Sequence, residues 1–312
     1  MRRWFSFAMP DWRALGLMWA PVAAVAAADL ILSRALGFGW ALGGAGVPRL
    51  FIIAALAALA VLAQAAGFRR VAAISDGFGR MLAFFVAAAA LQYLVAVLPK
   101  GSDDAALAAL DRDLGFDWQA LYAWFAAHPA WSPVLDGAYQ ALGWTMVFTV
   151  LFLGVVEPKK VSEFIAALMI ALALTVPALA LLPVAGPFAF YGHADLPQAW
   201  YTAHYLALRD GALKVIDLAD LRGIVSFPSF HAAGMALTLY AVRRYTLVFW
   251  PMILLDSGTL IATPTEGGHY LVDIIAGFAV AAVTVPLLRR LYREAAPQAS
   301  GTLAVSPAAP RA

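Results

Sequence analysis

Apolar stretches long enough to cross a bilayer recur along nearly the whole chain, and they limit the possible fold more than any other feature. A membrane-spanning helix needs about 20 mostly apolar residues. Of the 312 residues, 63% are hydrophobic and only 13% are charged, whereas soluble domains average about 25% charged residues. The sequence therefore predicts an all-α, polytopic membrane helical bundle. The eight predicted spans are 14–36, 48–67, 81–99, 134–156, 162–184, 226–242, 246–263 and 268–290.

Composition also excludes several classes of function. The chain has no cysteine, which rules out disulfides, thiolate metal sites and a cysteine nucleophile. It has no basic run or nucleic-acid-binding motif, so nucleic acid is not an expected partner.

Lys and Arg are distributed unevenly between the connections that join the predicted spans. Short loops rich in these residues mark the cytoplasmic side. If the spans alternate, both termini are predicted to be cytoplasmic, and the long loops 100–133 and 185–225 are predicted to face outward. The cations on the predicted cytoplasmic side are Arg2, Arg3, Arg13, Arg69, Arg70, Arg80, Lys159, Lys160, Arg243, Arg244, Arg289, Arg290 and Arg293.

Three regions are predicted along the chain. Residues 1–80 comprise a cytoplasmic N-terminus and two spans, 81–292 form a six-helix core, and 293–312 form an Ala/Pro/Ser-rich disordered tail. The basic, Ala-rich beginning also fits a cleaved signal peptide. The apolar run continues to Leu36, which favours an uncleaved span.

A short helix is predicted within the first outer loop, in "GFDWQALYAWFAAHP". Asp117 is its candidate N-cap and Pro129 its stop. Trp118, Tyr122 and Phe125 fall on one face, which favours a helix lying in the membrane interface. A loop helix packed on its neighbours is the alternative.

Two histidines open two predicted spans that enter from the same side. In "SFPSFHAA", Ser226 or Ser229 can cap the sixth span, and His231 lies in its first turn. In "TEGGHYLVDIIAG", His269 opens the eighth span, and Asp273 follows four residues later on the same helix face. We expect the free N–H groups of both helix starts to form an anion site.

These side chains suit covalent phosphoryl transfer. Asp273 would fix the Nδ1–H tautomer of His269, so that Nε2 can attack phosphorus. His231 would protonate the leaving oxygen and later deprotonate the incoming hydroxyl or water. The alternative is a metal site, since suitable ligand types occur in His231, Glu266, His269 and Asp273.

The two motifs resemble those of the type 2 phosphatidic acid phosphatase superfamily over residues 80–290. "SFPSFHA" is similar to its second motif, usually Pro-Ser-Gly-His, and "GGHYLVD" to its third, which ends in His-x-x-x-Asp. The closer likeness is to the inositol phosphorylceramide synthase branch, where the Gly of the second motif is often replaced, here by Phe230. The resemblance implies a six-helix core preceded by two extra spans. It also implies His269 as nucleophile, His231 as acid/base and Asp273 as orienting residue.

The chain departs from that family pattern at two usual phosphate-binding cations. It has no Lys-x6-Arg-Pro motif, and Thr263 stands where the third motif normally has Arg. Fewer cations suit a monoanionic phosphodiester better than a phosphomonoester, which is close to a dianion. Other candidate substrate contacts are Ser229, Phe230, Gly268, Tyr270, Arg209, Lys214 and Arg222, with Lys100, Tyr201 and His204 as weaker candidates.

The sequence thus predicts an integral-membrane phosphotransferase that moves a phospho-head-group between lipids through a phosphohistidine. We expect it in the cytoplasmic membrane, with its site on the external face. We also expect membrane lipids as its partners and no cofactor. One alternative is a lipid or isoprenoid phosphate phosphatase that uses water. The other is a non-enzymatic transporter or scaffold that retains the motifs. A transporter would line a midplane site with polar residues, but here they gather at one face.

Overall fold

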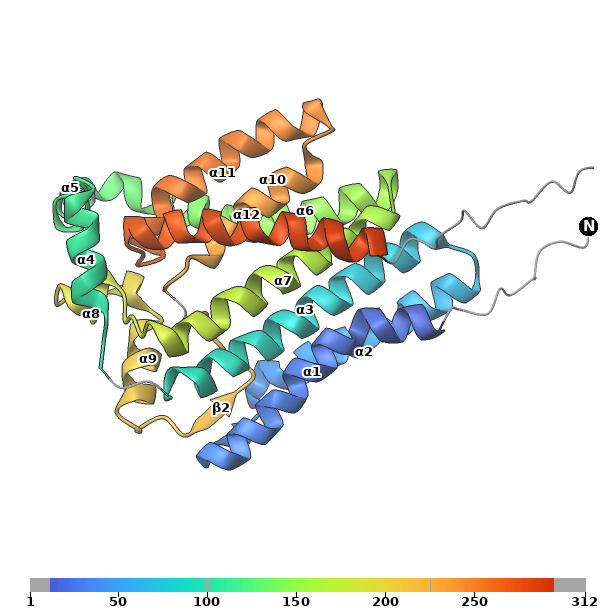
Figure 1. Ribbon diagram of the computed structural model, residues 1–312, viewed down its shortest axis with the longest axis horizontal. Helices are drawn as coiled ribbons and strands as arrows, with labels where there is room; N and C mark the ends of the chain where they lie inside the picture. The colour runs from blue at the N-terminus through green and yellow to red at the C-terminus, as the bar shows by residue number, and fades with distance from the viewer. Residues whose placement is uncertain (1–11, 99–100, 225, 295–312) are drawn as a thin grey trace, which may run out of the picture.

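The computed structural model describes residues 12–98, 101–224 and 226–294, and most of these are helical (Figure 1). Within these residues, seven helices are long and apolar enough to cross a membrane, which confirms the all-α, multi-pass architecture. These helices are α1 (Trp12–Leu36), α2 (Gly43–Ala65), α3 (Arg69–Ala96), α6 (Ser132–Val156), α7 (Lys159–Leu181), α11 (Thr246–Glu266) and α12 (Leu271–Glu294). The predicted tail 293–312 falls almost entirely outside the described residues.

Shorter elements complete the fold. They are the helices α4 (Asp104–Asp113), α5 (Trp118–Ala127), α8 (Pro187–Phe190), α9 (Thr202–Arg209) and α10 (Phe230–Val242), the 3₁₀ turns η1 (Pro129–Trp131) and η2 (Pro197–Ala199), and the strands β1 (Gly39–Ala41) and β2 (Val215–Asp217). All of these except α10 and β1 belong to the two loops predicted to face outward.

The sixth predicted span forms a helix of only 13 residues, α10. Such a helix is about 20 Å long, whereas the hydrocarbon core of a bilayer is about 30 Å thick. The helix starts late because Ser229 has extended backbone angles and its side chain accepts a hydrogen bond from the amide of Ala232. Residues 226–229, predicted to be helical, instead form an irregular segment in front of α10.

Helix α3 begins at Arg69, twelve residues before the predicted span, and runs through the middle of the bundle. Asp76 and Arg80 are charged residues just before the predicted start of the span. They form a buried ion pair at 2.5 Å, so the helix can include them. Within the membrane-length windows, 61% of α3 is buried but only 11% of α1 and of α2. Helices α1 and α2 therefore lie on the outside of α3 (Figure 1).

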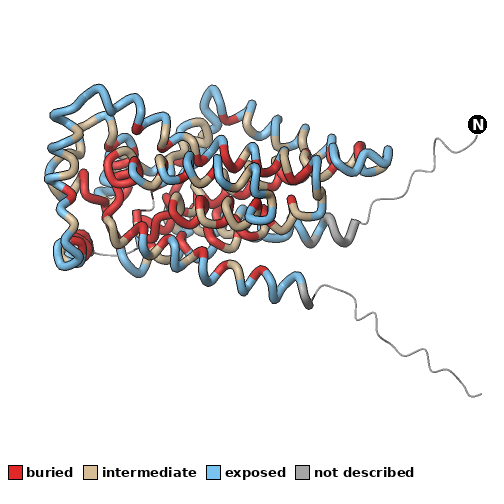
Figure 2. Tube along the Cα trace, turned by 90° about the horizontal axis from the view of Figure 1, so that it is seen from above, coloured by how far each residue is buried: buried red, intermediate tan, exposed pale blue. Residues whose placement is uncertain are grey.

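The core lies where α3, α6, α7, α10 and α12 meet. Fully or almost fully buried side chains from these helices pack together there, including Phe84, Val150, Leu168, Leu237 and Leu288. Figure 2 shows this distribution, with buried residues inside the bundle and exposed residues along the outer helices. Outward apolar side chains are the expected surface of a helix bundle that faces lipid.

The small elements gather at one end of the bundle, at the left of Figure 1. The connections between α2 and α3, α6 and α7, and α10 and α11 lie away from that end. A short parallel pairing of β1 with β2, unexpected from the sequence, joins the α1–α2 connection to the loop after α9. Gly39 pairs with Val215 and Ala41 with Asp217.

Helix α5 forms where the sequence predicts it, with Asp117 as the N-cap. The Asp117 side chain accepts a hydrogen bond from the amide of Ala120 at 3.0 Å. Trp118 is buried and its indole N–H donates to the carbonyl oxygen of Pro264 in α11 at 2.9 Å. Helix α5 is therefore packed on its neighbours at its first turn, whereas the side chain of Trp124 is exposed.

Candidate active site

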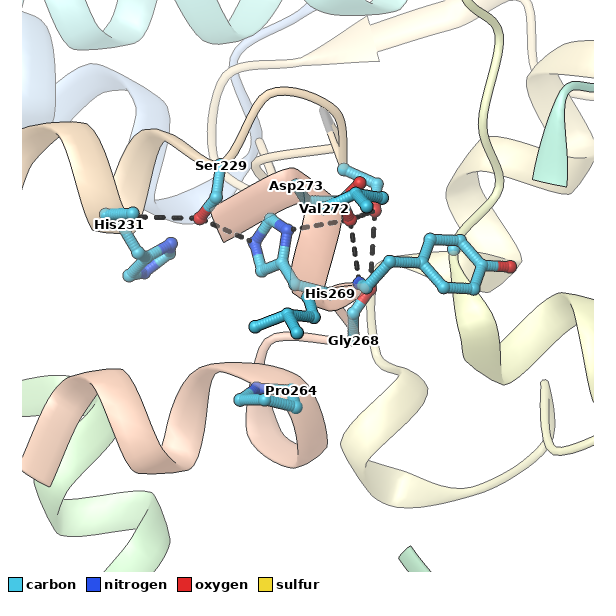
Figure 3. A network of polar contacts seen from close by, with 12 residues as sticks. Ser229, His231, Pro264, Gly268, His269, Val272 and Asp273 are labelled. Carbon is cyan, nitrogen blue, oxygen red and sulfur yellow. Dashed lines mark hydrogen bonds and ion pairs between the residues drawn. The ribbon is translucent and has the colours of Figure 1, made fainter. Parts of the chain in front are cut away.

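The two motif histidines lie close together, at the starts of two different helices (Figure 3). His231 is in the first turn of α10, and His269 is in the connection between α11 and α12. Their ring centroids are 6.0 Å apart, and the ring planes are inclined by 63°. Residues 38 positions apart in the chain are thus brought to within reach of one phosphate group.

Asp273 lies on the Nδ1 side of the His269 ring. One carboxylate oxygen of Asp273 is 3.4 Å from Nδ1 of His269, longer than the usual 2.7–3.2 Å, or about 2.9 Å, of a strong N–H···O bond. The same oxygen accepts hydrogen bonds from the amide of Tyr270 at 2.8 Å and the hydroxyl of Ser226 at 3.0 Å. Asp273 is fully buried, so these donors fix its position beside the imidazole.

The sequence predicted that His269 lies in the first turn of α12. It lies instead just before the helix, because α12 begins at Leu271. The preceding Gly268 has a φ of +61°, and a Cβ there would lie 2.1 Å from the hydroxyl oxygen of Tyr201. This glycine turn places His269 over Asp273. Burial lowers the pKa of His269, which favours the neutral imidazole that a nucleophile needs.

His231 is held by an aromatic ring rather than by a carboxylate. Its imidazole stacks on Tyr139 of α6, with centroids 4.3 Å apart and planes inclined by 25°. The Tyr139 hydroxyl oxygen is 3.3 Å from Nδ1 of His231. Sequence reasoning missed Tyr139, since an apolar span offers no local signal that separates this tyrosine from a lipid-facing one.

Ser229 couples the two motifs. Its hydroxyl caps α10 through Ala232 and lies 3.4 Å from Nε2 of His269. Its amide donates to the carbonyl oxygen of Asp273 at 2.9 Å. A Cβ on Gly277 would lie 2.3 Å from the Ser229 carbonyl oxygen, so only glycine permits this approach of α12 to the start of α10.

Two aspartates of α4, which the sequence did not single out, support the site from outside. Asp111 accepts hydrogen bonds from the amides of Leu271 and Val272, both at 2.9 Å. The prediction of a free anion site at the start of α12 is therefore wrong, because Asp111 occupies those amides. Asp104 accepts from the Tyr270 hydroxyl at 3.1 Å, which directs the Tyr270 side chain toward α4.

A cavity of about 830 Å³ adjoins both imidazoles. Its described lining includes two carboxylates and no Lys or Arg. Polar side chains line it at Gln92, Ser132, Asp136, Gln140, Thr175, Gln198, Ser226 and Glu266, and aromatic ones at Tyr139, Trp200, Tyr201 and Phe230. Apart from the two histidines, the charged side chains of the described lining are thus acidic.

Three of the predicted phosphate-binding cations, all in the described part of the chain, do not line this cavity. Arg209 donates to the carbonyl oxygens of Ala96 and Gly101, and the Lys214 ammonium lies over the ring of Phe38. Arg222, the third of these cations, is nearer the cavity. Arg222 pairs with Asp220 at 3.2 Å and lies over the ring of Trp200, a lining residue. Lys100 lies outside the described residues.

Among the other candidate substrate contacts, some line the cavity and others do not. Phe230 and Tyr201 line the cavity, and the Tyr201 hydroxyl donates to the carbonyl oxygen of Gly268 at 3.1 Å. Thr263 is buried, with its hydroxyl bonded within α11 to the carbonyl oxygen of Thr259. His204 lies apart, with Nδ1 2.7 Å from the Tyr93 hydroxyl oxygen; burial and the charge of Arg222 lower its pKa.

The side chains of the alternative metal site do not assemble as a ligand set. Among the described residues, no three His, Asp or Glu side chains are placed to hold one metal ion. Asp273 faces away from His231, toward Ser226 and the amide of Tyr270 (Figure 3). The geometry therefore favours the pairing of one imidazole with one carboxylate.

A family model described as the PAP2 superfamily matches residues 105–287, more than half of the chain, and this segment contains both histidine motifs. No curated protein and no solved structure matches the chain.

Proposed function

Because the chain belongs to the PAP2 superfamily, and is thus of the lipid phosphatase or phosphotransferase type, we propose that it transfers a phospho-head-group from one lipid to another. The observation that carries this proposal is the pair of imidazoles beside one cavity, only one of which has a carboxylate partner. That asymmetry supports covalent attack by His269 and proton transfer by His231.

In the first step, Nε2 of His269 attacks the phosphorus of a phospholipid. The bond between phosphorus and the diacylglycerol oxygen breaks, and His231 donates a proton to that oxygen. Asp273 stabilises the positive charge on the attacking imidazole through Nδ1. The N-terminus of α10 points its helix dipole at the phosphoryl oxygens. In the second step, an acceptor hydroxyl gives its proton to His231 and displaces His269 from phosphorus.

The charge of the cavity supports a phosphodiester donor. With Asp136 and Glu266 in its wall and no Lys or Arg among its described lining residues, it repels a phosphate dianion more than a monoanion. The same carboxylates, with the glutamines, can accept hydrogen bonds from a polyol head group. An inositol phospholipid fits these features, in line with an inositol phosphorylceramide synthase-like activity.

We also propose that the site lies at the external face of the cytoplasmic membrane, with both termini cytoplasmic. The distribution of Lys and Arg supports this orientation. The chain has no cysteine of its own, so single cysteines can be labelled directly. With an impermeant thiol reagent on intact cells, Ala212→Cys should react and Arg244→Cys should not. The opposite labelling would reverse the orientation.

The decisive test of the activity is incubation of the purified protein with phospholipids labelled in the phospho-head-group, with and without a lipid alcohol. We expect a new labelled lipid that appears only with the acceptor. Release of water-soluble labelled phosphate as the sole product would identify a hydrolase instead. Absence of turnover with every donor would overturn the enzymatic assignment.

A further inference from the structure

A second, smaller cavity opens beside the first and shares part of its wall. It measures about 210 Å³, against about 830 Å³ for the main cavity. It lies between α5, the start of α6 and the end of α11. Ser132, Gln198 and Glu266 line both cavities, so the two spaces meet at these three polar side chains.

The wall of this side cavity is mostly apolar. Its nonpolar and aromatic lining comes from Tyr122, Phe125, Ala126, Pro129 and Leu135. One further polar residue lines it, Thr265, which is 2% exposed. The Thr265 hydroxyl has no hydrogen-bond partner. Buried polar groups without partners are rare and unfavourable, so a polar group of a ligand in this cavity would satisfy the hydroxyl.

The side cavity lies near side chains that are typical of a membrane interface. Trp118 fixes the start of α5 to the end of α11 through Pro264. Trp124 and Trp131, near the other end of α5, are exposed. Exposed tryptophans are typical of the level of lipid head groups, where the hydroxyl of a membrane-embedded alcohol also lies.

We propose that the side cavity binds the lipid alcohol that accepts the phospho-head-group, an inference that rests on the proposed transferase function. The apolar portion of the acceptor lipid, next to its reacting hydroxyl, packs against Phe125 and Ala126. A second polar group of the acceptor, such as an amide or a hydroxyl, bonds to Thr265. The reacting hydroxyl then lies at the junction of the two cavities, facing the phosphorus on His269.

The chemistry of the second step explains what this cavity achieves. The acceptor oxygen attacks phosphorus, the bond from phosphorus to Nε2 of His269 breaks, and the acceptor proton passes to His231. The leaving alcohol of the first step and the incoming oxygen occupy the same position at phosphorus in turn. Water can also take that position, but it makes no contact with the apolar wall. The side cavity therefore favours lipid transfer over hydrolysis.

The test measures how the phosphohistidine intermediate partitions between its two fates. The full-length protein is incubated with a head-group-labelled inositol phospholipid and a ceramide, and the ratio of labelled new lipid to water-soluble label is determined. This ratio does not depend on the rate of the first step. Ala126→Trp, which fills the side cavity, should lower the ratio at least tenfold. Ala123→Trp, on the same helix but outside the lining, should leave it unchanged.

Thr265→Val gives a second, nearly isosteric variant that removes only the hydroxyl. We expect it to raise the KM for ceramide several-fold and to lower the ratio, with an unchanged melting temperature in detergent. If the wild-type protein makes no new lipid, the transferase function itself is overturned. If the wild-type protein does, while Ala126→Trp and Thr265→Val keep its ratio and KM, only the acceptor site is overturned.

Discussion

The surroundings of the two active-site imidazoles differ although the rings are neighbours. His269 is 3% exposed and lies between the carboxylate of Asp273 and the hydroxyl of Ser229. His231 is less buried and stacks on a neutral phenol, Tyr139. A carboxylate stabilises the positive charge that develops on an attacking ring, while a phenol orients a ring without holding its proton. In the proposed mechanism, this contrast separates the nucleophile from the acid/base within one cavity.

The largest expected effect comes from removing the rings themselves. His269→Ala should form no phosphorylated adduct with any donor. His231→Ala should still accumulate adduct with a donor whose leaving group is p-nitrophenolate, since that group departs without protonation. The second step then lacks its general base, which is typically worth about 10²–10⁴-fold. Mass spectrometry of samples quenched at mildly alkaline pH maps the adduct.

The same experiment can break the comparison in two ways. Adduct on His231 in the His269→Ala variant would exchange the roles of the two rings. Lack of adduct in the wild-type protein and in every variant would indicate direct attack on the donor by the acceptor hydroxyl.

The next effect in size tests the carboxylate. Asp273→Asn should lower kcat by about 10²–10⁴-fold, because an amide that donates to Nδ1 leaves the proton on Nε2, the attacking nitrogen. Binding of a nonhydrolysable phosphate analogue, followed by calorimetry, should change little. Ser226→Ala, which removes one donor to Asp273, serves as the milder control. Near-wild-type turnover of Asp273→Asn would reduce Asp273 to a packing residue.

A smaller effect tests the aromatic partner of His231. Tyr139→Phe keeps the ring stack but removes the hydroxyl, and a hydrogen bond contributes about 0.5–1.5 kcal/mol. We therefore expect kcat to fall about two- to tenfold, with adduct formation from the activated donor unaffected. Stopped-flow measurement of the two half-reactions separates these outcomes. A fall confined to the first half-reaction would place Tyr139 with the nucleophile instead.

The smallest effect concerns the cations. Arg222 lies over Trp200 at the cavity wall, and exposed charge pairs are worth about 0.2–1 kcal/mol. Arg222→Gln should therefore raise the KM for donor about two- to fivefold. Lys214→Gln, at a residue that is not part of the cavity lining, should leave it unchanged in the same initial-rate assay. A larger change for Lys214→Gln would restore that residue as a phosphate contact.

Local features of the molecule could be predicted from the sequence. Apolar stretches gave the membrane helices, and the N-cap at Asp117 gave the start of α5. The proximity of His231 and His269 followed from two helices that start on the same side. The spans and the N-cap each lie within one segment, so periodicity and capping rules describe them without knowledge of the fold. The approach of the two histidines required only the alternation of the spans across the membrane as well.

Contacts between distant segments could not be predicted in this way. Asp111 caps α12 across 160 positions, and the pairing of Trp40 with Ile216 joins even more distant strands. In "ALDRDLG" an aspartate of a solvated loop helix and one that caps a distant helix look identical. Only the folded positions of α4 and α12 distinguish them.

The shortness of α10 sets the depth at which the chemistry takes place. If its C-terminal end lies at the cytoplasmic boundary, as the arginines after it indicate, a helix of about 20 Å ends about 10 Å short of the opposite boundary. His231 at its start, and with it the imidazole of His269 at a centroid distance of 6.0 Å, then lies below the level of the lipid phosphates. A phospholipid has to sink its head group into the protein while its chains stay in the leaflet, and thinning of the surrounding bilayer by shorter lipids should ease that descent.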